Sequence, residues 1–317
     1  MLKKDNIAIR IIILNYNGRP LLEECLPSIT QASSSSKLKC SVCVIDNLST
    51  DDSVSFLRSS YRDIELIESG ENKVLCGFNQ VLKDGVEDIS VLLNNDMKVD
   101  AGFVDPLVEA FLKHEDAFLA VPKIMSFDGK TCENGKGRTR MRYGMFWAKS
   151  RYPGYEKEIE QEGIISHGAN GAFLRKRFVE LGGFDSLYLP GIMEEADLCF
   201  RAYKQGERCY YVPGSVIYHK GRASFKKVYA ERKIEALAHR NTFLFMWKNI
   251  SSPRYVVEHL FFLLPRLLVS VLTGKFEFAW GFFQALPRLS LALGRRRSTL
   301  SQDNLKSDEE VMRQFSS

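Results

Sequence analysis

Hydrophobic runs alternate with polar turns and helix-like segments over the first part of the chain. Residues 7–14 are apolar except for Arg10 and rich in β-branched side chains, which is typical of a strand buried on both faces of a parallel sheet. Pro20 opens a predicted helix that ends near residue 32, and residues 33–36 are predicted to form a loop. Further strands are predicted at residues 40–45, 64–67 and 89–93, and a further helix at about 76–87. This order predicts an α/β fold with a doubly wound, mostly parallel sheet and helices on both faces.

The second part of the chain has a less even pattern. Residues 126–163 are rich in Gly, Arg and Tyr and are interpreted as an insertion or mobile loop over the site. A helix is predicted to open at Glu194, and strands are predicted at residues 171–175, 210–212 and 216–219. The α/β pattern therefore continues to about residue 222.

Polar side chains follow directly after the predicted strands. Asn15 and Asn17 follow the first strand, Asp46 follows the second, and Asn94, Asn95 and Asp96 follow the fourth. The carboxyl ends of parallel strands share one edge of the sheet, where open α/β sheets bind their ligands. Two carboxylates at that edge suggest a phosphate-bearing ligand handled through a divalent cation. No Gly-x-Gly-x-x-Gly follows the first strand and no Walker A sequence occurs, which argues against classical dinucleotide and P-loop sites.

Composition adds a charge division to this picture. The 317 residues are 45% hydrophobic and 26% charged, which fits a globular protein and excludes disorder, collagen and coiled coil for the whole chain. The formal net charge is +5, but residues 219–297 hold 15 Lys and Arg against 4 Asp and Glu. That span carries +11 and the remainder −6, so an acidic body is joined to a basic, aromatic-rich arm.

The seven cysteines are scattered, and the N-terminal residues show no signal-peptide pattern. Together these features favour a reduced, cytoplasmic setting. Cys40 and Cys43 have the spacing of half a metal or redox motif. Because they lie in a predicted strand with no second pair, buried packing is the favoured interpretation.

The basic arm is predicted to be helical over residues 229–248, 255–273 and 276–293. Neither apolar segment resembles a clean membrane span, because charged residues and prolines interrupt both: Glu258, Pro265 and Arg266 in the first, Glu277, Pro287 and Arg288 in the second. A wide apolar face with basic and aromatic edges predicts helices that lie in the membrane interface. Packing on the α/β body, or a dimer interface, is the alternative.

An ordered series of short motifs runs from about residue 8 to about residue 222. These motifs are residues 12–18, 44–49, 71–72, 92–96, 171–177, 182–185, 194–201, 212–214 and 219. The series resembles the family 2 glycosyltransferases of the GT-A fold, most closely their bacterial rhamnosyltransferase-like branch.

The resemblance implies roles for individual residues. Asp46 would hydrogen-bond the nucleotide base, Asn95 would contact the ribose, and Asp96 would bind Mn²⁺ or Mg²⁺, with His219 completing the metal or diphosphate site. Asn94-Asn95-Asp96 stands where the family more often has Asp-x-Asp. The remaining contacts to the nucleotide sugar are expected from Asn15, Asn17, Asn72, Asn79, Asn94 and His167.

The resemblance also implies a carboxylate general base near residue 195. Inverting transfer needs a base for the proton of the acceptor hydroxyl. Glu195 aligns with the usual base, and Glu194 is the alternative. Acidic residues at a helix N-terminus are also expected from the helix dipole alone. Val74 stands where the resemblance implies a glycine.

These observations predict three regions: a GT-A catalytic domain over residues 1–225, a basic helical region over 226–297, and a disordered polar tail over 298–317. We expect an inverting, metal-assisted glycosyltransferase that moves a hexosyl or deoxyhexosyl group from a UDP-, dTDP- or GDP-linked donor. The acceptor would be a glycan or lipid-linked molecule in cell-envelope polysaccharide synthesis. The protein would be peripheral at the inner face of the cell membrane and could form a homodimer, and no nucleic-acid role is expected. The alternatives are a nucleotidyltransferase and a non-catalytic, membrane-associated nucleotide-sugar-binding protein.

Overall fold

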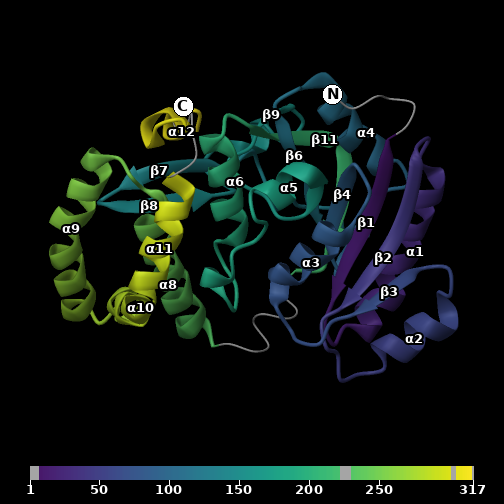
Figure 1. The fold of residues 1–317 in the computed structure, drawn as a ribbon, viewed down its shortest axis with the longest axis horizontal. Helices are drawn as coiled ribbons and strands as arrows, with labels where there is room; N and C mark the ends of the chain where they lie inside the picture. Colours follow the sequence, from purple (N-terminus) through teal and green to yellow (C-terminus); the bar gives the residue numbers. More distant parts are fainter. Residues whose placement is uncertain (1–6, 222–229, 301–304, 316–317) are drawn as a thin grey trace.

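The computed structural model describes residues 7–221, 230–300 and 305–315, and its centre is a mixed sheet of nine strands (Figure 1). Eight of them follow the order β3-β2-β1-β4-β10-β6-β11-β5, and β9 pairs with β11. The pairs among β3, β2, β1 and β4 are parallel, as is β6 with β11, whereas β10 and β5 run antiparallel to their neighbours. The strands are β1 (Ala8–Asn15), β2 (Lys39–Asp46), β3 (Glu65–Glu68), β4 (Ile89–Asn94), β5 (Met97–Val99), β6 (Ala117–Ser126), β9 (Gly163–Ile164), β10 (Gly171–Leu174) and β11 (Arg208–His219).

Helices cover both faces of this sheet, as predicted. Alternate residues of β1 point to opposite faces, so Ile11 and Ile13 join one hydrophobic core and Ile12 and Leu14 join the other. The first core includes side chains of α1 (Arg19–Ser35), α2 (Ser53–Ser60) and α4 (Val104–Lys113). The second includes side chains of α3 (Gly77–Asp84), α5 (Arg175–Glu180) and α6 (Glu194–Lys204). Short 3-10 turns, η2 (Val74–Cys76), η3 (Tyr155–Lys157) and η4 (Ser186–Tyr188), lie in the connections.

Two element boundaries differ from the predictions. Helix α1 continues through Ser35, because Ser34 and Thr30 hydrogen-bond backbone carbonyls of the helix, so the predicted loop at residues 33–36 is wrong for most of its length. The strands predicted at 210–212 and 216–219 form the single strand β11. Its register against β6 shifts between Val212 and Val216, at Pro213 and Gly214.

The segment expected to be an irregular loop contains a β-hairpin. Strands β7 (Arg138–Arg142) and β8 (Met145–Lys149) pair with each other and not with the main sheet. Phe146 of β8 stacks on Phe245, with ring centroids 4.2 Å apart, and both side chains are buried. Of the two interpretations of residues 126–163, a mobile loop is therefore wrong for this hairpin, whereas an insertion agrees with a hairpin that pairs outside the main sheet and packs against the C-terminal helices.

The C-terminal helices gather at one end of the molecule, opposite strands β1–β3 (Figure 1). They are α8 (Glu231–Asn249), α9 (Pro253–Leu272), α10 (Glu277–Ala285), the 3-10 turn η5 (Leu286–Arg288) and α11 (Leu289–Leu300). Residues Phe243 to Met246 of α8 belong to the same core cluster as α6. The predicted boundary between residues 225 and 226 lies outside the described residues. Helix α8, which follows that boundary, packs in the same hydrophobic core as the α/β body.

The tail predicted to be disordered carries helix α12 (Asp308–Arg313), so that prediction is wrong for residues 305–315. Ser307 and Glu310 form a reciprocal capping box at its start. Asp308 is buried and accepts hydrogen bonds from Lys204 Nζ at 2.7 Å and from the backbone N–H groups of Ser251 and Ser252. The polar residues of this tail thus include Asp308, which forms a buried ion pair. Residues 301–304 and 316–317 of the predicted tail lie outside the described residues.

Helix α9 is long and apolar enough to cross a membrane by length and composition. An 18-residue window has a mean hydropathy of 1.7, and only 11% of it is buried inside the protein. Its polar residues face inward: Glu258 accepts from Gly144 N–H, and Arg266 donates to Tyr143 O, both at the tip of the β-hairpin. The outer face of α9 is thus largely apolar and open, whereas Glu258 and Arg266 hold the hairpin.

Candidate active site

Three polar side chains from three strand ends form one buried chain at the carboxyl edge of the sheet. Asn15 Nδ2 donates to Asp46 Oδ2 at 2.9 Å, and Asn95 Nδ2 donates to Asn15 Oδ1 at 2.7 Å. All three side chains are buried, and the second oxygen of Asp46 accepts from Ser49 N–H. Each carboxylate oxygen keeps a further lone pair. The convergence expected from the strand order is therefore present.

Gly18 allows this chain to close. A Cβ atom added at Gly18 would lie 1.9 Å from Asn95 Nδ2 and 2.6 Å from Asn15 Oδ1. Any side chain there would push the two amides apart, so glycine is required by close approach.

Asn17 and Asn94 use their polar groups to connect loops. Asn17 Oδ1 accepts from the backbone N–H of Thr50 at 2.7 Å, and Asn17 itself has a φ of 47°, in the left-handed region. The backbone N–H of Asn94 donates to Asn170 Oδ1 at 3.2 Å. Both residues lie at the predicted edge, and these contacts fix the loops that surround it.

Asp96 and His219 lie side by side at the same edge. His219 Nε2 is 3.3 Å from Asp96 Oδ2, and His219 Nδ1 is 2.7 Å from Glu133 Oε2. Burial alone would lower the pKa of His219, but its hydrogen bonds to Asp96 and Glu133 and their charges raise that pKa to about 9. Sequence reasoning missed Glu133, because it lies in the irregular insertion with no motif around it.

These residues fit a divalent cation. Asp96 Oδ1 is buried and has no hydrogen-bond partner, so a carboxylate oxygen is left for another ligand. A carboxylate that orients a histidine through its other ring nitrogen, as Glu133 does for His219, is a common support for a metal ligand. Within residues 7–221, 230–300 and 305–315, no group of three or more His, Cys, Asp or Glu is arranged to hold a metal. Further oxygen ligands would therefore have to come from the donor or from water.

Asn72 and Asn79 lie away from the buried chain. Asn72 Oδ1 accepts from the backbone N–H of Val74 at 3.0 Å and holds Val74 at a φ of 49°. Left-handed backbone is unfavourable for a β-branched side chain. This steric cost accounts for the glycine that the resemblance implies at position 74. Asn79 pairs both its amide groups with the backbone of Phe184, at 2.8 and 2.9 Å, so in this structure its amide holds a turn.

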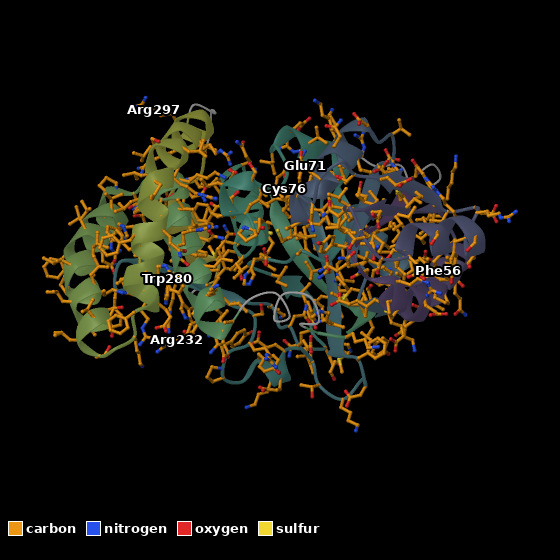
Figure 2. All side chains as sticks on the ribbon, turned by 90° about the horizontal axis from the view of Figure 1, so that it is seen from below. Phe56, Glu71, Cys76, Arg232, Trp280 and Arg297 are labelled. Atoms are coloured by element: carbon orange, nitrogen blue, oxygen red, sulfur yellow. The ribbon has the colours of Figure 1, made fainter. Side chains whose placement is uncertain are left out.

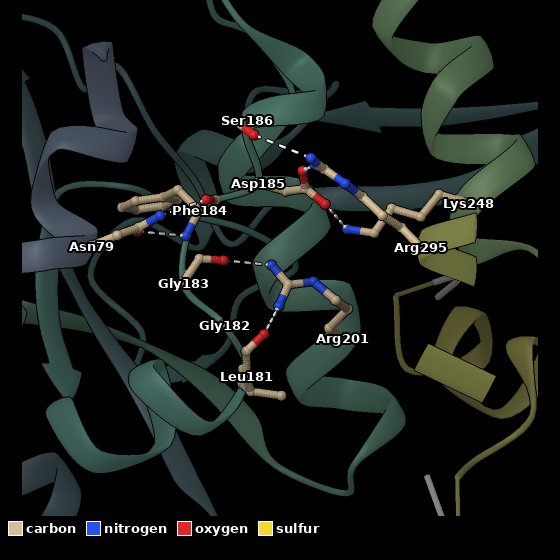
Figure 3. Close-up of a pocket in the computed structure, with 10 residues that line it drawn as sticks. All are labelled: Asn79, Leu181, Gly182, Gly183, Phe184, Asp185, Ser186, Arg201, Lys248 and Arg295. Carbon is tan, nitrogen blue, oxygen red and sulfur yellow. Dashed lines mark hydrogen bonds and ion pairs between the residues drawn. The ribbon is translucent and has the colours of Figure 1, made fainter. Parts of the chain in front are cut away.

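That turn, residues 181–186, borders a cavity of about 350 Å³ (Figure 3). Arg201 donates to the carbonyls of Leu181 and Gly183, and Asp185 is paired with both Lys248 and Arg295. The positive side chains that line the cavity thus bind groups of the turn itself. They fix the segment that leads to Glu194.

Glu194 and Glu195 begin helix α6 and have different surroundings. Glu194 is fully buried, and neither of its carboxylate oxygens has a hydrogen-bond partner. Burial, and then the charge of Glu195, raise the pKa of Glu194 to about 8. Burial also raises the pKa of Glu195, which is partly exposed. Glu195 is therefore the carboxylate that an incoming molecule can reach.

Helix α8 fixes the backbone that leads into these glutamates. Ile192 and Met193 have φ values of 74° and 86°, so two non-glycine residues in a row are left-handed. Asn241 Nδ2 donates to the carbonyls of Tyr188, Gly191 and Ile192 at 2.6–2.8 Å. Arg240 donates to the carbonyls of Tyr188 and Leu189. The sequence analysis missed Arg240 and Asn241, because nothing in the pattern of the basic arm indicated that this helix contacts the backbone before Glu194.

A buried ion cluster also ties α8 to α6. Asp197 Oδ2 accepts from Arg201 Nε at 2.8 Å, and Lys248 Nζ lies 2.6 Å from Asp197 Oδ1. Tyr188 and Asn249 complete the hydrogen bonds of Asp197. Although burial opposes ionisation, Lys248 and Arg201 hold the pKa of Asp197 well below its usual range.

His167 lies against the insertion. Its Nδ1 is 2.8 Å from Ser166 Oγ, and its Nε2 is 3.3 Å from Ser150 Oγ next to β8. Burial lowers its pKa to about 4, so the ring is neutral. These contacts place His167 beside the hairpin, and none of them joins it to the buried chain of Asn15, Asp46 and Asn95.

A family model described as Glycosyl transferase family 2 matches residues 10–182, more than half of the chain. The chain belongs to glycosyl transferase family 2. The match spans the strand-end residues of this family 2 chain and ends just before the segment that carries Glu194. No curated protein matches it.

Solved structures share the fold of this family 2 chain. The crystal structure of GalNAc-T7 with UDP, GalNAc and Mn²⁺ has a TM-score of 0.65 at 15% identity and covers 98% of this chain, which spans 57% of that one. A mannosyltransferase from Pyrobaculum calidifontis in complex with GDP-Man and Mn²⁺ has a TM-score of 0.54 at 15% identity, covering 95% of this chain and 89% of that one. S. aureus TarS 1-349 in complex with UDP-GlcNAc has a TM-score of 0.56 at 14% identity, with coverages of 92% and 89%. The fold of this family 2 chain is thus of the GT-A type.

Proposed function

We propose that the protein is an inverting glycosyltransferase that takes a hexosyl or deoxyhexosyl group from a nucleotide diphosphate donor. The observation that carries the proposal is the strand-end group, in which Asn15, Asp46 and Asn95 form one hydrogen-bonded chain and Asp96 has an unpartnered oxygen beside His219. A UDP-, dTDP- or GDP-linked donor suits this edge, since related folds have been solved with UDP, UDP-GlcNAc and GDP-Man. The motif order favours the rhamnosyltransferase-like branch.

Asp96 and His219 would hold Mn²⁺ or Mg²⁺. The cation would offset the negative charge that develops on the departing nucleoside diphosphate. Glu133 positions the His219 ring through Nδ1, and the buried chain from Asn15 to Asp46 holds the nucleoside side of the edge.

Glu195 is the proposed general base. Its carboxylate takes the proton of the acceptor hydroxyl while that oxygen attacks the anomeric carbon, and the bond from that carbon to the diphosphate oxygen breaks. Glu194 has no exposed surface and a pKa of about 8, so it holds its proton at neutral pH and leaves the negative charge on Glu195. The proposed base is thus the carboxylate that is partly exposed.

The acceptor is proposed to be a glycan or lipid-linked molecule used in cell-envelope polysaccharide synthesis, with the protein at the inner face of the membrane. The open apolar face of α9 supports this placement, because residues such as Phe261 and Leu264 are more than 60% exposed. Isolated apolar side chains on a surface are ordinary, but a continuous face marks a contact. We keep residues 1–225 as the proposed catalytic region and residues 226–297 as the proposed helical region, with α8 serving both.

The test is metal-dependent release of nucleoside diphosphate from a panel of UDP-, dTDP- and GDP-sugars. With the best donor, Glu195→Gln is expected to lower kcat by about 10²–10⁴, the usual contribution of a general base. Glu194→Gln is the matched control and is expected to keep most of the activity. Full activity in Glu195→Gln would refute the base assignment, and donor binding without any release would favour the non-catalytic alternative.

A further inference from the structure

A cavity of about 480 Å³ lies between the β7–β8 hairpin and helix α8, and we call it the hairpin cavity. Tyr143 and Trp147 of the hairpin segment line one side, and His239 of α8 lines another. Ile192 and Met193, which directly precede Glu194, form part of its wall. The cavity therefore borders the backbone that positions the proposed base.

The charged residues that line the hairpin cavity are both arginines. Arg142 and Arg266 line it, and no carboxylate does. Among the ion pairs of the described residues, none joins either arginine to an acid; Arg266 instead donates to the carbonyls of Arg142 and Tyr143. Burial, and then the charge of Arg142, lower the pKa of Arg266. Two guanidinium groups that disfavour each other and lack an anion form a site suited to phosphate.

The walls also offer flat apolar surface. Trp147 and Tyr143 bring aromatic faces to the cavity, and Arg140 stacks over Trp147 with its guanidinium carbon 4.6 Å from the ring centroid. Aromatic rings give large contact area at low entropic cost, and the polar atoms of Trp and Tyr leave them compatible with wet sites. Together with the arginines, they suit a ligand that carries both a ring system and an anionic group.

A second cavity of about 580 Å³ continues the first toward helix α9. The two share His239 and Arg266, and the second extends past Val269 to Thr273 and Lys275 at the C-terminal end of α9. Arg232, another of its lining residues, and Trp280 of α10 lie at the helical end of the molecule, far from Phe56 of α2 (Figure 2). The second cavity thus leads from Arg266 to the exposed apolar helix. Because Glu231, Glu235 and Glu277 also line it, an anionic group is assigned to the hairpin cavity and not to this one.

The apolar face of α9 begins where this path ends. Leu264 and Leu268 are 63% and 54% exposed, Val269 in the second cavity is 58% exposed, and Leu272 is 84% exposed. An amphiphile with its sugar near Met193 and its phosphate at Arg142 and Arg266 would leave its apolar part at this face.

We propose that the two cavities form the acceptor site and that the acceptor is a glycan joined to a lipid through a diphosphate. This inference rests on the proposed function and names the acceptor class for it. The two arginines are complementary in charge to the diphosphate. The aromatic walls suit the sugar ring, and the exposed apolar face of α9 suits the lipid. The hairpin and α9 are thereby parts of substrate binding.

The test is binding of farnesyl diphosphate to the full chain, measured by titration calorimetry with a metal chelator present so that the metal-dependent donor site does not contribute. Arg142→Gln removes a guanidinium that forms no ion pair with an acid among the described residues and lies over the Tyr143 ring, and is expected to weaken binding about tenfold, the value of one hydrogen bond to a charged group. Arg254→Gln, an exposed arginine on α9, is the matched control and is expected to bind as the wild type does. Inorganic diphosphate and farnesol are each expected to bind at least tenfold more weakly than farnesyl diphosphate.

Trp147 provides a second readout that does not depend on affinity alone. Farnesyl diphosphate is expected to change the fluorescence of the wild type, and Trp147→Phe is expected to lose most of that change while retaining its Tm. Equal binding by Arg142→Gln and Arg254→Gln would overturn the site. Equal affinity for inorganic diphosphate and farnesyl diphosphate would overturn the lipid-linked class. Donor turnover is measured separately, so a wild type that binds the probe but releases no nucleoside diphosphate would refute the proposed function and not this site.

Discussion

The strand-end group and helix α8 contribute to one candidate active site by different means. Asn15 and Asp46 end strands β1 and β2, and Asn95 follows β4 directly, so the parallel sheet brings their side chains together without help from other elements. Helix α8 reaches the site from more than 40 residues further along the chain, through Asn241 and Lys248. The comparison teaches that the proposed metal and nucleotide contacts lie at the sheet edge, whereas the backbone before the proposed base is held by a helix outside the family match. Substitutions in the first region should change activity, and those in the second should change stability as well.

Asp96→Ala gives the largest expected effect. It removes the carboxylate with a free oxygen beside His219, so kcat with Mn²⁺ is expected to fall by about 10³, because a bound cation supplies several kcal/mol of charge stabilisation. The free energy of unfolding should change little by comparison. Steady-state kinetics and urea unfolding measure the two quantities. A stability loss larger than the catalytic loss would contradict the division between the regions.

Lys248→Met is expected to destabilise the protein by about 3–5 kcal/mol, because it leaves Asp185 and Asp197 without their shared cation in a buried site. Urea unfolding followed by circular dichroism measures it. Lys233→Met, an exposed lysine on the same helix, is the control and should change stability by no more than about 0.5 kcal/mol. Similar effects of the two substitutions would show that the cluster does not hold α8 to α6.

Asn241→Leu removes the donor shared by three carbonyls before Glu194, and is expected to cost about 1–3 kcal/mol of stability. If α8 positions the base, kcat should fall while the KM for the donor stays near the wild-type value. Kinetics at a temperature well below the Tm of the variant separate this from unfolding. An unchanged kcat in a destabilised variant would leave α8 with a purely structural role.

The pH dependence of stability tests the protonated state of Glu194. Its pKa is about 8 in the folded protein against an ordinary value of 4.5, so the folded state holds this proton more tightly. Stability from this group is present below pH 4.5 and is lost as the pH rises toward 8, with a slope approaching about 1.4 kcal/mol per pH unit. Glu194→Gln should flatten the curve of unfolding free energy against pH over that window. Identical slopes for wild type and variant would contradict the assignment.

Val74→Gly is the smallest expected effect, and it is stabilising. Glycine relieves a left-handed β-branched residue but adds freedom to the unfolded chain, so the net gain is expected to be about 1 kcal/mol. Val86→Gly, at an exposed position without a positive φ, is the control and should be neutral or destabilising. A thermal melt distinguishes the two. A lower Tm for Val74→Gly would show that this strain is absent.

The sheet and its polar edge could be predicted from sequence because both depend on local pattern. A β-branched run such as residues 7–14 has one favoured structure, and the polar residue after it then falls at the carboxyl edge. Glu133, Asn241 and Lys248 could not be predicted, since each acts on a residue 49 or more positions away with no motif to mark the pair. The α12 tail was misjudged for a related reason. Polar composition indicated disorder, whereas Asp308 is buried and paired with a lysine 104 positions earlier.

Helix α12 has a consequence for the order in which the molecule is completed during synthesis. Lys204, at the end of the helix that begins with Glu194, is 4% exposed, and Asp308 is the carboxylate paired with it. The same carboxylate accepts from the N–H groups at the corner between α8 and α9. A nascent chain that has emerged from the ribosome only as far as α11 therefore carries a lysine at a buried position without its anion. The sheet edge can form early, but the helix bearing the proposed base is secured only after some hundred further residues have been made.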